Sequence, residues 1–207
     1  MGEGIMSFRS TIRIITSCLL SVLPLAGAEK DLMVVHRKDA ETWVLEWRGK
    51  TYRCAVGKNG VAAEGQKREG DGKTPSGTYV LRGLYYRPDK VDPRKLPASL
   101  KPTALTLNDG WCDEPKAPEY NRFVQLPFAP SHEELWRKND DLYDLILPLG
   151  YNDDPVVPGL GSAIFMHVAR SNYGGTAGCV VLAKQDLLEV LRTVEPGCRI
   201  RIEFDKP

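Results

Sequence analysis

An excess of charge of either sign is what this sequence most clearly lacks: 28 Lys and Arg residues against 27 Asp and Glu residues give a net charge of +1. A protein that neutralises many phosphates needs a basic surplus, so general nucleic-acid binding is disfavoured. Histidine is scarce, with three residues, and the five cysteines form no CxxC pair. Because zinc-finger spacing is absent, we expect neither a metal nor another cofactor.

Long apolar runs are also few, and the clearest one stands near the N-terminus. Arg9 and Arg13 precede the apolar stretch 14–23, and the small residues Ala26-Gly27-Ala28 follow it. This order is typical of a secretory signal, and the stretch is too short for a comfortable membrane span. We therefore predict a signal peptide over residues 1–28, cleavage after its last residue, export to the cell envelope, and no stable membrane span after cleavage.

The mature chain, residues 29–207, contains no internal repeat, low-complexity tract or interdomain linker, so we expect one domain. Most of its apolar runs are short, rich in β-branched and aromatic residues, and bounded by glycine, proline or polar residues, which favours strands. We interpret the segment 87–102 as a long surface loop, and the Pro-rich stretches 88–102 and 109–120 as candidate walls of a groove. Strands are predicted at 32–35, 42–47, 51–56, 77–82, 103–107, 143–147, 162–168, 178–182 and 199–204.

One or two short helices complete the mainly β fold class. Leucines at 187, 188 and 191 with a valine at 194 have helical spacing, and Pro196-Gly197 follows them, so we predict a helix over 184–194. Ser131 and Glu134 have the spacing of a capping box, which predicts a second, shorter helix over 131–136.

One histidine and one cysteine stand at the ends of neighbouring predicted strands. His167 closes the strand 162–168, a Gly-rich loop follows, and Cys179 lies in the strand 178–182. If the two strands are adjacent, the loop brings the imidazole within hydrogen-bonding reach of the thiol, as in a Cys–His nucleophile. An imidazolium there would lower the thiol pKa from about 8.5 to about 6. Gly178, which has no Cβ, would let a substrate carbonyl approach the Cys179 amide.

Four further residues are candidate substrate contacts, each with a structural alternative left open. Arg170 would bind a carboxylate or be a solvated strand-end residue. Tyr151 and Asn152 would hold an amine or belong to a solvated turn. Trp111 would line the groove or belong to the core. The remaining mature cysteines, Cys54, Cys112 and Cys198, are interpreted as inert or paired with one another.

The sequence resembles the L,D-transpeptidase catalytic domain, the YkuD-like family of cell-wall enzymes. The resemblance rests on His167, on the later Thr176-Ala177-Gly178-Cys179-Val180, and on the upstream stretch 67–78, and it extends from about Met33 to Phe204. Ala177 stands where many members have a second histidine, and Leu182 where many have Arg or Asn, so the branch with Gly-Cys-Val-x-Leu is the closer match.

The resemblance implies a single β-sandwich or β-barrel domain that acts in peptidoglycan biosynthesis and cell-wall organisation, in the periplasm. Cys179 would attack a peptidoglycan stem peptide and form a thioester, His167 would act as acid and base, and Thr176 would border the substrate. A backbone carbonyl would orient the imidazole. The stem peptide is the expected partner, and we expect a monomer.

Two alternatives stay open at this point. If water takes the place of the acceptor amine, the enzyme is an L,D-carboxypeptidase only. If Cys179 is tied into a disulfide, for example to Cys198, the chain is a non-catalytic envelope protein that binds peptidoglycan.

Overall fold

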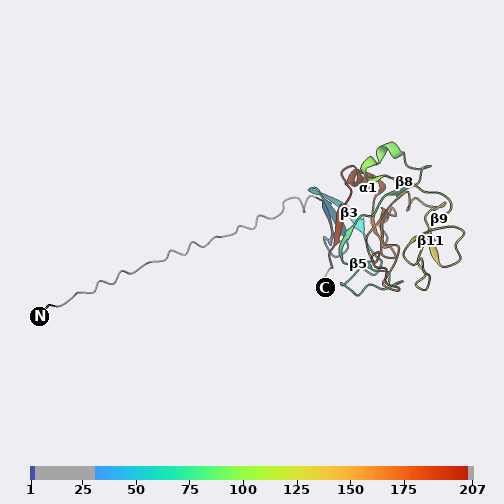
Figure 1. Cartoon of the computed structure of the whole chain (residues 1–207). Coiled ribbons are helices and arrows are strands. Elements are labelled where there is room, and N and C mark those ends of the chain that lie inside the picture. The colour runs from blue at the N-terminus through green and yellow to red at the C-terminus, as the bar shows by residue number, and fades with distance from the viewer. Residues whose placement is uncertain (3–30, 205–207) are drawn as a thin grey trace.

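A computed structural model describes residues 1–2 and 31–204. Residues 3–28 of the predicted signal peptide, with its cleavage site, lie outside the described residues. Within 31–204 the chain forms one body of short strands with a single α-helix, so the mainly β prediction is confirmed (Figure 1). No helix among the described residues is long and apolar enough to cross a membrane.

The described strands form a ten-stranded sheet, a three-stranded sheet and a two-stranded pair. The order in the large sheet is β6 (Gly77–Val80), β15 (Arg199–Ile202), β1 (Leu32–Arg37), β2 (Trp43–Trp47), β3 (Lys50–Ala55), β14 (Val180–Leu182), β13 (Phe165–Val168), β12 (Leu145–Pro148), β7 (Tyr85–Tyr86) and β8 (Thr103–Ala104). The small sheet has the order β10 (Phe123–Gln125), β9 (Asp109–Cys112) and β11 (His132–Glu134), and the pair is β4 (Val61–Ala62) with β5 (Thr74–Pro75).

The first three strands form the antiparallel meander that their pattern predicts. Only Arg48 and Gly49 connect β2 to β3, with φ angles of 47° and 76°. Two consecutive positive φ angles define the hairpin turn whose twist matches that of the flanking strands. The turn fixes the register, so Leu45 and Trp47 of β2 enter the same core.

The large sheet has a buried cluster on each face in the region of β12, β13 and β14. Met166 and Val168 of β13, with Val180 and Leu182 of β14, belong to the main core. The alternate residues Phe165, Cys179 and Val181 belong to a second cluster with residues from the segment 105–143. Because successive side chains of a strand point to opposite faces, one strand pair supplies both clusters. Figure 1 shows β9 and β11, which belong to this segment, on the side of the molecule away from β3.

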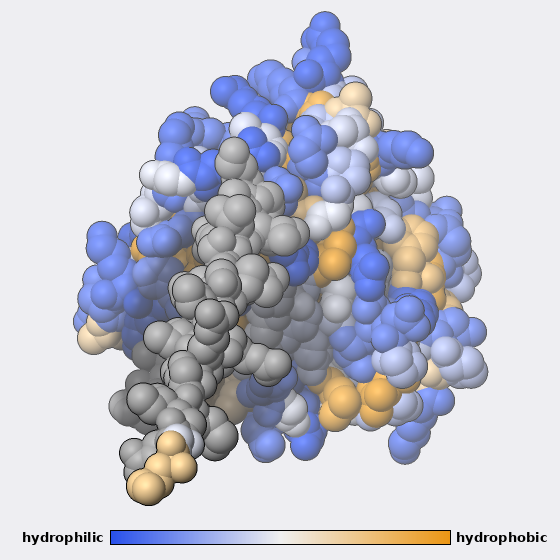
Figure 2. All heavy atoms as spheres, turned by 60° about the vertical axis from the view of Figure 1, so that its left-hand side comes forward, coloured by the Kyte–Doolittle hydropathy of each residue, from blue (hydrophilic) through white to orange (hydrophobic). Residues whose placement is uncertain are grey.

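Helix α1 (Lys184–Leu191) follows β14 directly and packs on the main core through Leu187, Val190 and Leu191. The prediction placed its end at Val194. In the structure the amides of Thr193 and Val194 bond carbonyls three residues earlier, so the last turn is tighter than an α-helix. Figure 2 shows that hydrophilic side chains predominate on the face it displays, with hydrophobic ones in small scattered groups.

The second predicted helix, over 131–136, is wrong: His132–Glu134 form strand β11. This strand pairs with β9, with Glu133 opposite Trp111. The Ser131 and Glu134 spacing is a local signal, and a six-residue helix is too short to be stable without packing. The pairing of this segment with β9, which lies about twenty residues earlier in the chain, outweighs the capping signal.

Two predicted strands are shorter than expected at the ends that matter for the site. β13 begins at Phe165 instead of residue 162, and β14 at Val180 instead of residue 178. Ala163 has φ 51° and Gly178 has φ 153°, and neither angle belongs to a strand. The stretch 88–102 is a loop with two short 3-10 helices, Pro93–Lys95 and Ala98–Leu100.

Candidate active site

His167 lies in β13, and Cys179 immediately precedes the adjacent parallel strand β14, on the same face of the sheet. β13 pairs with β14 so that His167 is opposite Val181, two residues beyond Cys179. Side chains two residues apart share a face, so Cys179, Val181 and His167 all point away from the main core. The cysteine is 7 % and the histidine 6 % exposed, and both line one cavity of about 260 Å³. The two strands are adjacent, which is the condition that the Cys–His arrangement requires.

The Cys179 thiol is held by backbone groups. Its sulfur donates a hydrogen bond to the carbonyl oxygen of Ala163 at 3.3 Å and accepts one from the amide of Phe165 at 3.4 Å. Thr176 Oγ1 accepts a hydrogen bond from the Gly178 amide and donates one to the Cys179 carbonyl. Among the described residues none accepts a hydrogen bond from the Cys179 amide. This N–H group is available to a substrate oxygen.

Gly178 is required by its surroundings. A Cβ at this position would lie 2.9 Å from Ile164 Cδ1 and 2.9 Å from the carbonyl oxygen of Lys73. The second contact is with backbone, which cannot rotate away, and the φ of 153° is itself unfavourable for other residues. The glycine therefore lets the 65–75 segment pack directly beside the cysteine.

The His167 ring is oriented by two carbonyls, as the resemblance implied. Nδ1 lies 2.9 Å from the carbonyl oxygen of Val168 and 3.1 Å from that of Leu142. Because carbonyls only accept, Nδ1 carries the proton and Nε2 keeps a free lone pair. The ring of Tyr143 meets the imidazole edge-on, with centroids 5.0 Å apart. The histidine is thus fixed in the form that accepts a proton at Nε2.

The pKa values of the two groups favour a neutral pair in the resting protein over the predicted imidazolium–thiolate pair. Burial lowers the pKa of His167 to about 4, although the hydrogen bonds to Val168 and Leu142 act in the opposite direction. Burial raises the pKa of Cys179 to about 12, against the Phe165 amide, which lowers it. Both groups are neutral near pH 7. No hydrogen bond joins the two side chains among the described contacts, because the thiol proton is directed to Ala163.

Several other residues line the cavity that the sequence did not predict as site residues. They come from segments far apart along the chain, and most are charged. Only Arg170 and Thr176 of the predicted substrate contacts are among the lining residues. The lining residues that were not predicted as site residues include Lys58, Lys67, Glu69, Asp113, Glu133, Arg137, Tyr143, Ser162 and Ala163. No local signal in the sequence distinguishes Glu133, because it stands between His132 and Glu134 in a polar segment.

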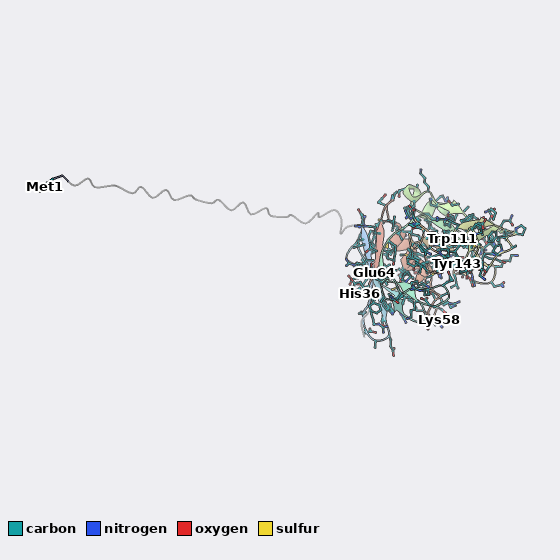
Figure 3. All side chains as sticks on the ribbon, turned by 60° about the horizontal axis from the view of Figure 1, so that its bottom comes forward. Met1, His36, Lys58, Glu64, Trp111 and Tyr143 are labelled. Carbon is teal, nitrogen blue, oxygen red and sulfur yellow. The ribbon has the colours of Figure 1, made fainter. Side chains whose placement is uncertain are left out.

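Trp111, Tyr151 and Asn152 are not among the residues that line this cavity. Trp111 and Tyr143, both labelled in Figure 3, pack edge-on against Phe165, with ring centroids 5.1 Å and 6.2 Å from that of Phe165. Trp111 therefore packs in the layer behind the cavity, which agrees with the alternative that assigned it to the core.

Tyr151 and Asn152 shape a neighbouring loop. The Tyr151 hydroxyl donates to the carbonyl of Leu160, and Asn152 Nδ2 donates to the carbonyls of Val157 and Gly161. These bonds hold the loop 157–161 that leads to Ala163. Of the two stretches predicted as groove walls, 109–120 contributes Asp113 to the lining and 88–102 contributes no residue.

The two other histidines and the remaining mature cysteines lie outside the cavity lining. His36 pairs with Glu46 at 3.1 Å, and His132 Nδ1 contacts the carbonyl of Pro130. All four described cysteines are free and buried, so neither a Cys179–Cys198 bridge nor a pairing among the others forms. Among the described residues no group of three or more His, Cys, Asp or Glu residues is placed to hold a metal ion.

Comparison with known proteins gives one strong match. The profile of the YkuD family, described as the L,D-transpeptidase catalytic domain, matches residues 30–202. A search of curated protein sequences finds no significant match.

Solved structures give distant matches. The Bd1075 protein of Bdellovibrio bacteriovorus is 17 % identical with a TM-score of 0.42, and the match covers 84 % of this chain and 48 % of that one. An L,D-transpeptidase from Mycobacterium smegmatis is 14 % identical with a TM-score of 0.38, and the match covers 84 % of this chain and 59 % of that one. L,D-transpeptidase 1 of Mycobacterium tuberculosis is 12 % identical with a TM-score of 0.33, and the match covers 83 % of this chain and 62 % of that one. This chain thus spans about half to three fifths of the length of these proteins.

Proposed function

Since the chain belongs to the family of L,D-transpeptidase catalytic domains, we propose that it transfers acyl groups of peptidoglycan stem peptides through a thioester on Cys179. One observation carries the proposal. A neutral imidazole with a free Nε2 lone pair and a thiol line the same cavity; the imidazole comes from β13, and the thiol from the residue that precedes the adjacent strand β14. A nucleophile and a base in one small cavity are the minimum that acyl transfer requires.

Acylation starts from the neutral pair. As the sulfur of Cys179 attacks the carbonyl carbon of the bond before the terminal D-amino acid, the thiol proton passes to His167 Nε2 and a carbon–sulfur bond forms. The carbonyl oxygen becomes an oxyanion, which the unpartnered Cys179 amide is available to stabilise. The carbon–nitrogen bond then breaks, the imidazolium returns its proton to the leaving amine, and a thioester and a free D-amino acid result.

Deacylation repeats these steps with another nucleophile. An amine of a second stem peptide attacks the thioester while Nε2 accepts one of its protons, a carbon–nitrogen bond forms, and the sulfur leaves and regains the proton from the imidazolium. The product is a cross-link. With water as the nucleophile the product is a shortened stem peptide, so the same site supports the carboxypeptidase reaction.

Thr176 and Arg170 have separate parts in this proposal. Thr176 fixes the backbone at Gly178 and Cys179 through its hydroxyl. Arg170 is exposed at the edge of the cavity, where a guanidinium is suited to a substrate carboxylate. The substrate lies outside the cytoplasm, which is why we also place the protein in the periplasm or cell envelope.

The test is incubation of the purified protein with muropeptides, with products identified by mass. The wild-type protein is expected to form cross-linked dimers and release a D-amino acid, and Cys179→Ala is expected to be inactive. Cys198→Ala, which removes a buried cysteine outside the cavity, serves as the matched control and is expected to keep activity. Shortened stem peptides without dimers support the carboxypeptidase. Equal products from wild type and Cys179→Ala would refute the proposal.

A further inference from the structure

Lys67 places a buried positive charge in the wall of the candidate active site. Its side chain is only 4 % exposed, and it lines the same cavity as Cys179 and His167. Lysine is almost never fully buried without a reason, because its ammonium group loses hydration. The other lysine of this cavity, Lys58, is exposed to solvent.

The surroundings of Lys67 hold its ammonium group in place. Nζ donates to Asp71 Oδ1 at 2.7 Å and to the carbonyl oxygen of Arg68 at 2.7 Å. A Cβ at Gly161 would lie 3.2 Å from Lys67 Cε, so the glycine gives the stem room to pass. An ammonium group has three N–H donors, and only two have acceptors among the described residues. The third is available to the cavity.

Stability alone does not explain this arrangement. A buried ion pair gains little over a well-packed apolar pair, because removing both charges from water costs about as much as their attraction returns. Near Cys179, however, a fixed cation is useful, since the reaction converts a neutral thiol into a species with negative charge on sulfur and then on oxygen. Glu133, from β11, lines the same cavity with the opposite charge.

We propose that the Lys67 ammonium group stabilises the negative charge that develops at Cys179 when the thiol proton moves to His167 Nε2. This proposal rests on the proposed function and assigns a residue to its first step. The proton leaves sulfur for nitrogen, the electron pair stays on sulfur, and Lys67 keeps all its protons, so no other reactant takes part. In agreement, the charge of Lys67 lowers the pKa of the Cys179 thiol, while that of Glu133 raises it.

The experiment measures alkylation of Cys179 by iodoacetamide, an uncharged reagent, at neutral pH, with the modified residue identified by mass. Lys67→Gln keeps polar atoms near Asp71 and Arg68 but removes the charge, and we expect alkylation to slow about tenfold, the effect of one pKa unit. Lys67→Arg restores the charge and is expected to stay within about threefold of wild type. Rescue by arginine separates a role of the charge from a role in packing.

The control is Lys73→Gln, which removes an exposed lysine from the same turn and is expected to leave the rate unchanged. Thermal unfolding checks that each variant is folded, and Lys67→Met replaces Lys67→Gln if the latter does not fold. A folded Lys67→Gln that reacts at the wild-type rate, or a Lys67→Arg as slow as Lys67→Gln, overturns the proposal. Alkylation needs no peptide. A wild-type protein that is inactive on muropeptides would therefore refute the proposed function, and the alkylation rates would still test the role of Lys67.

Discussion

The sulfur of Cys179 donates its hydrogen bond to the carbonyl oxygen of Ala163, 3.3 Å away, and not to the imidazole of His167. Ala163 has a left-handed φ of 51°, which costs free energy in a residue other than glycine. The amide of Ala163 is held by Asn121 Oδ1 at 3.1 Å. The position of the thiol therefore depends on a strained residue whose conformation a buried asparagine maintains.

Removing Asn121 should loosen this arrangement. Its side chain accepts hydrogen bonds from Trp111 Nε1 and the Ala163 amide and donates to the carbonyls of Tyr151 and Asn152. Asn121→Ala leaves these four part-buried groups without this partner, so we expect the free energy of unfolding to fall by about 3 kcal/mol and muropeptide activity to fall with it. Urea unfolding measures the first quantity.

The control for that measurement is Asn139→Ala, which replaces an exposed asparagine and is expected to change the free energy of unfolding by no more than about 0.5 kcal/mol. An Asn121→Ala protein as stable as this control would show that the loop 157–163 holds its conformation without the asparagine.

The pH dependence of acylation follows from the two pKa values. His167 must be neutral to accept the thiol proton, and its pKa is lowered to about 4 by burial. Acylation, measured as kcat/KM for release of the D-amino acid, should therefore rise between about pH 3 and 5 and be level near neutrality. No second rise is expected below pH 10, because the pKa of Cys179 is about 12. A rise centred near pH 6.5 would contradict a buried, neutral imidazole.

Glu133 should have an effect opposite to that of Lys67. Its negative charge raises the pKa of Cys179, and it lines the same cavity from β11. Glu133→Gln is therefore expected to speed alkylation of Cys179 by iodoacetamide at neutral pH by at least as much as Lys67→Gln slows it, about tenfold. Glu134→Gln, on the same strand but exposed and outside the cavity lining, is the matched control and should not change the rate. Equal rates for the two variants would show that the carboxylate does not influence the thiol.

Local sequence patterns were sufficient to predict the strand that carries His167, the loop after it and the next strand, although Cys179 stands just before that strand and not within it. The hairpin at Arg48 and Gly49 and helix α1 could be predicted for the same reason, since each is encoded by residues close together in the chain. Glu133 is different, because its segment has a helix-capping pattern and becomes a strand only by pairing with β9.

The chemistry of the site depends still more on tertiary structure. The thiol pKa is raised to about 12 because the segment 105–143 covers the outer face of β13 and β14, and no spacing in the sequence encodes that burial. Lys67 is in a turn whose sequence suggests an exposed loop, yet the close approach of Gly161 and Asp71 buries it. Trp111 was predicted to line the groove, but its ring packs against Phe165, a contact that depends on tertiary structure.

Burial of His167 also predicts a loss of stability in acid. Its pKa is about 4 in the folded protein and 6.5 when exposed, so the unfolded chain binds more protons between these values. The contribution to stability is complete above about pH 6.5 and is lost as the pH falls through 4. Between pH 7 and pH 5 the free energy of unfolding should fall by about 2 kcal/mol from this group alone.

His167→Gln cannot be protonated, so the free energy of unfolding measured in urea should fall by less in this variant, the difference being that amount. His36→Gln removes a histidine from outside the cavity, and its free energy of unfolding should fall between pH 7 and pH 5 as much as that of the wild type. An equal fall in wild type and His167→Gln would mean that the imidazole gains its proton without unfolding, and therefore that the cavity opens to water in acid.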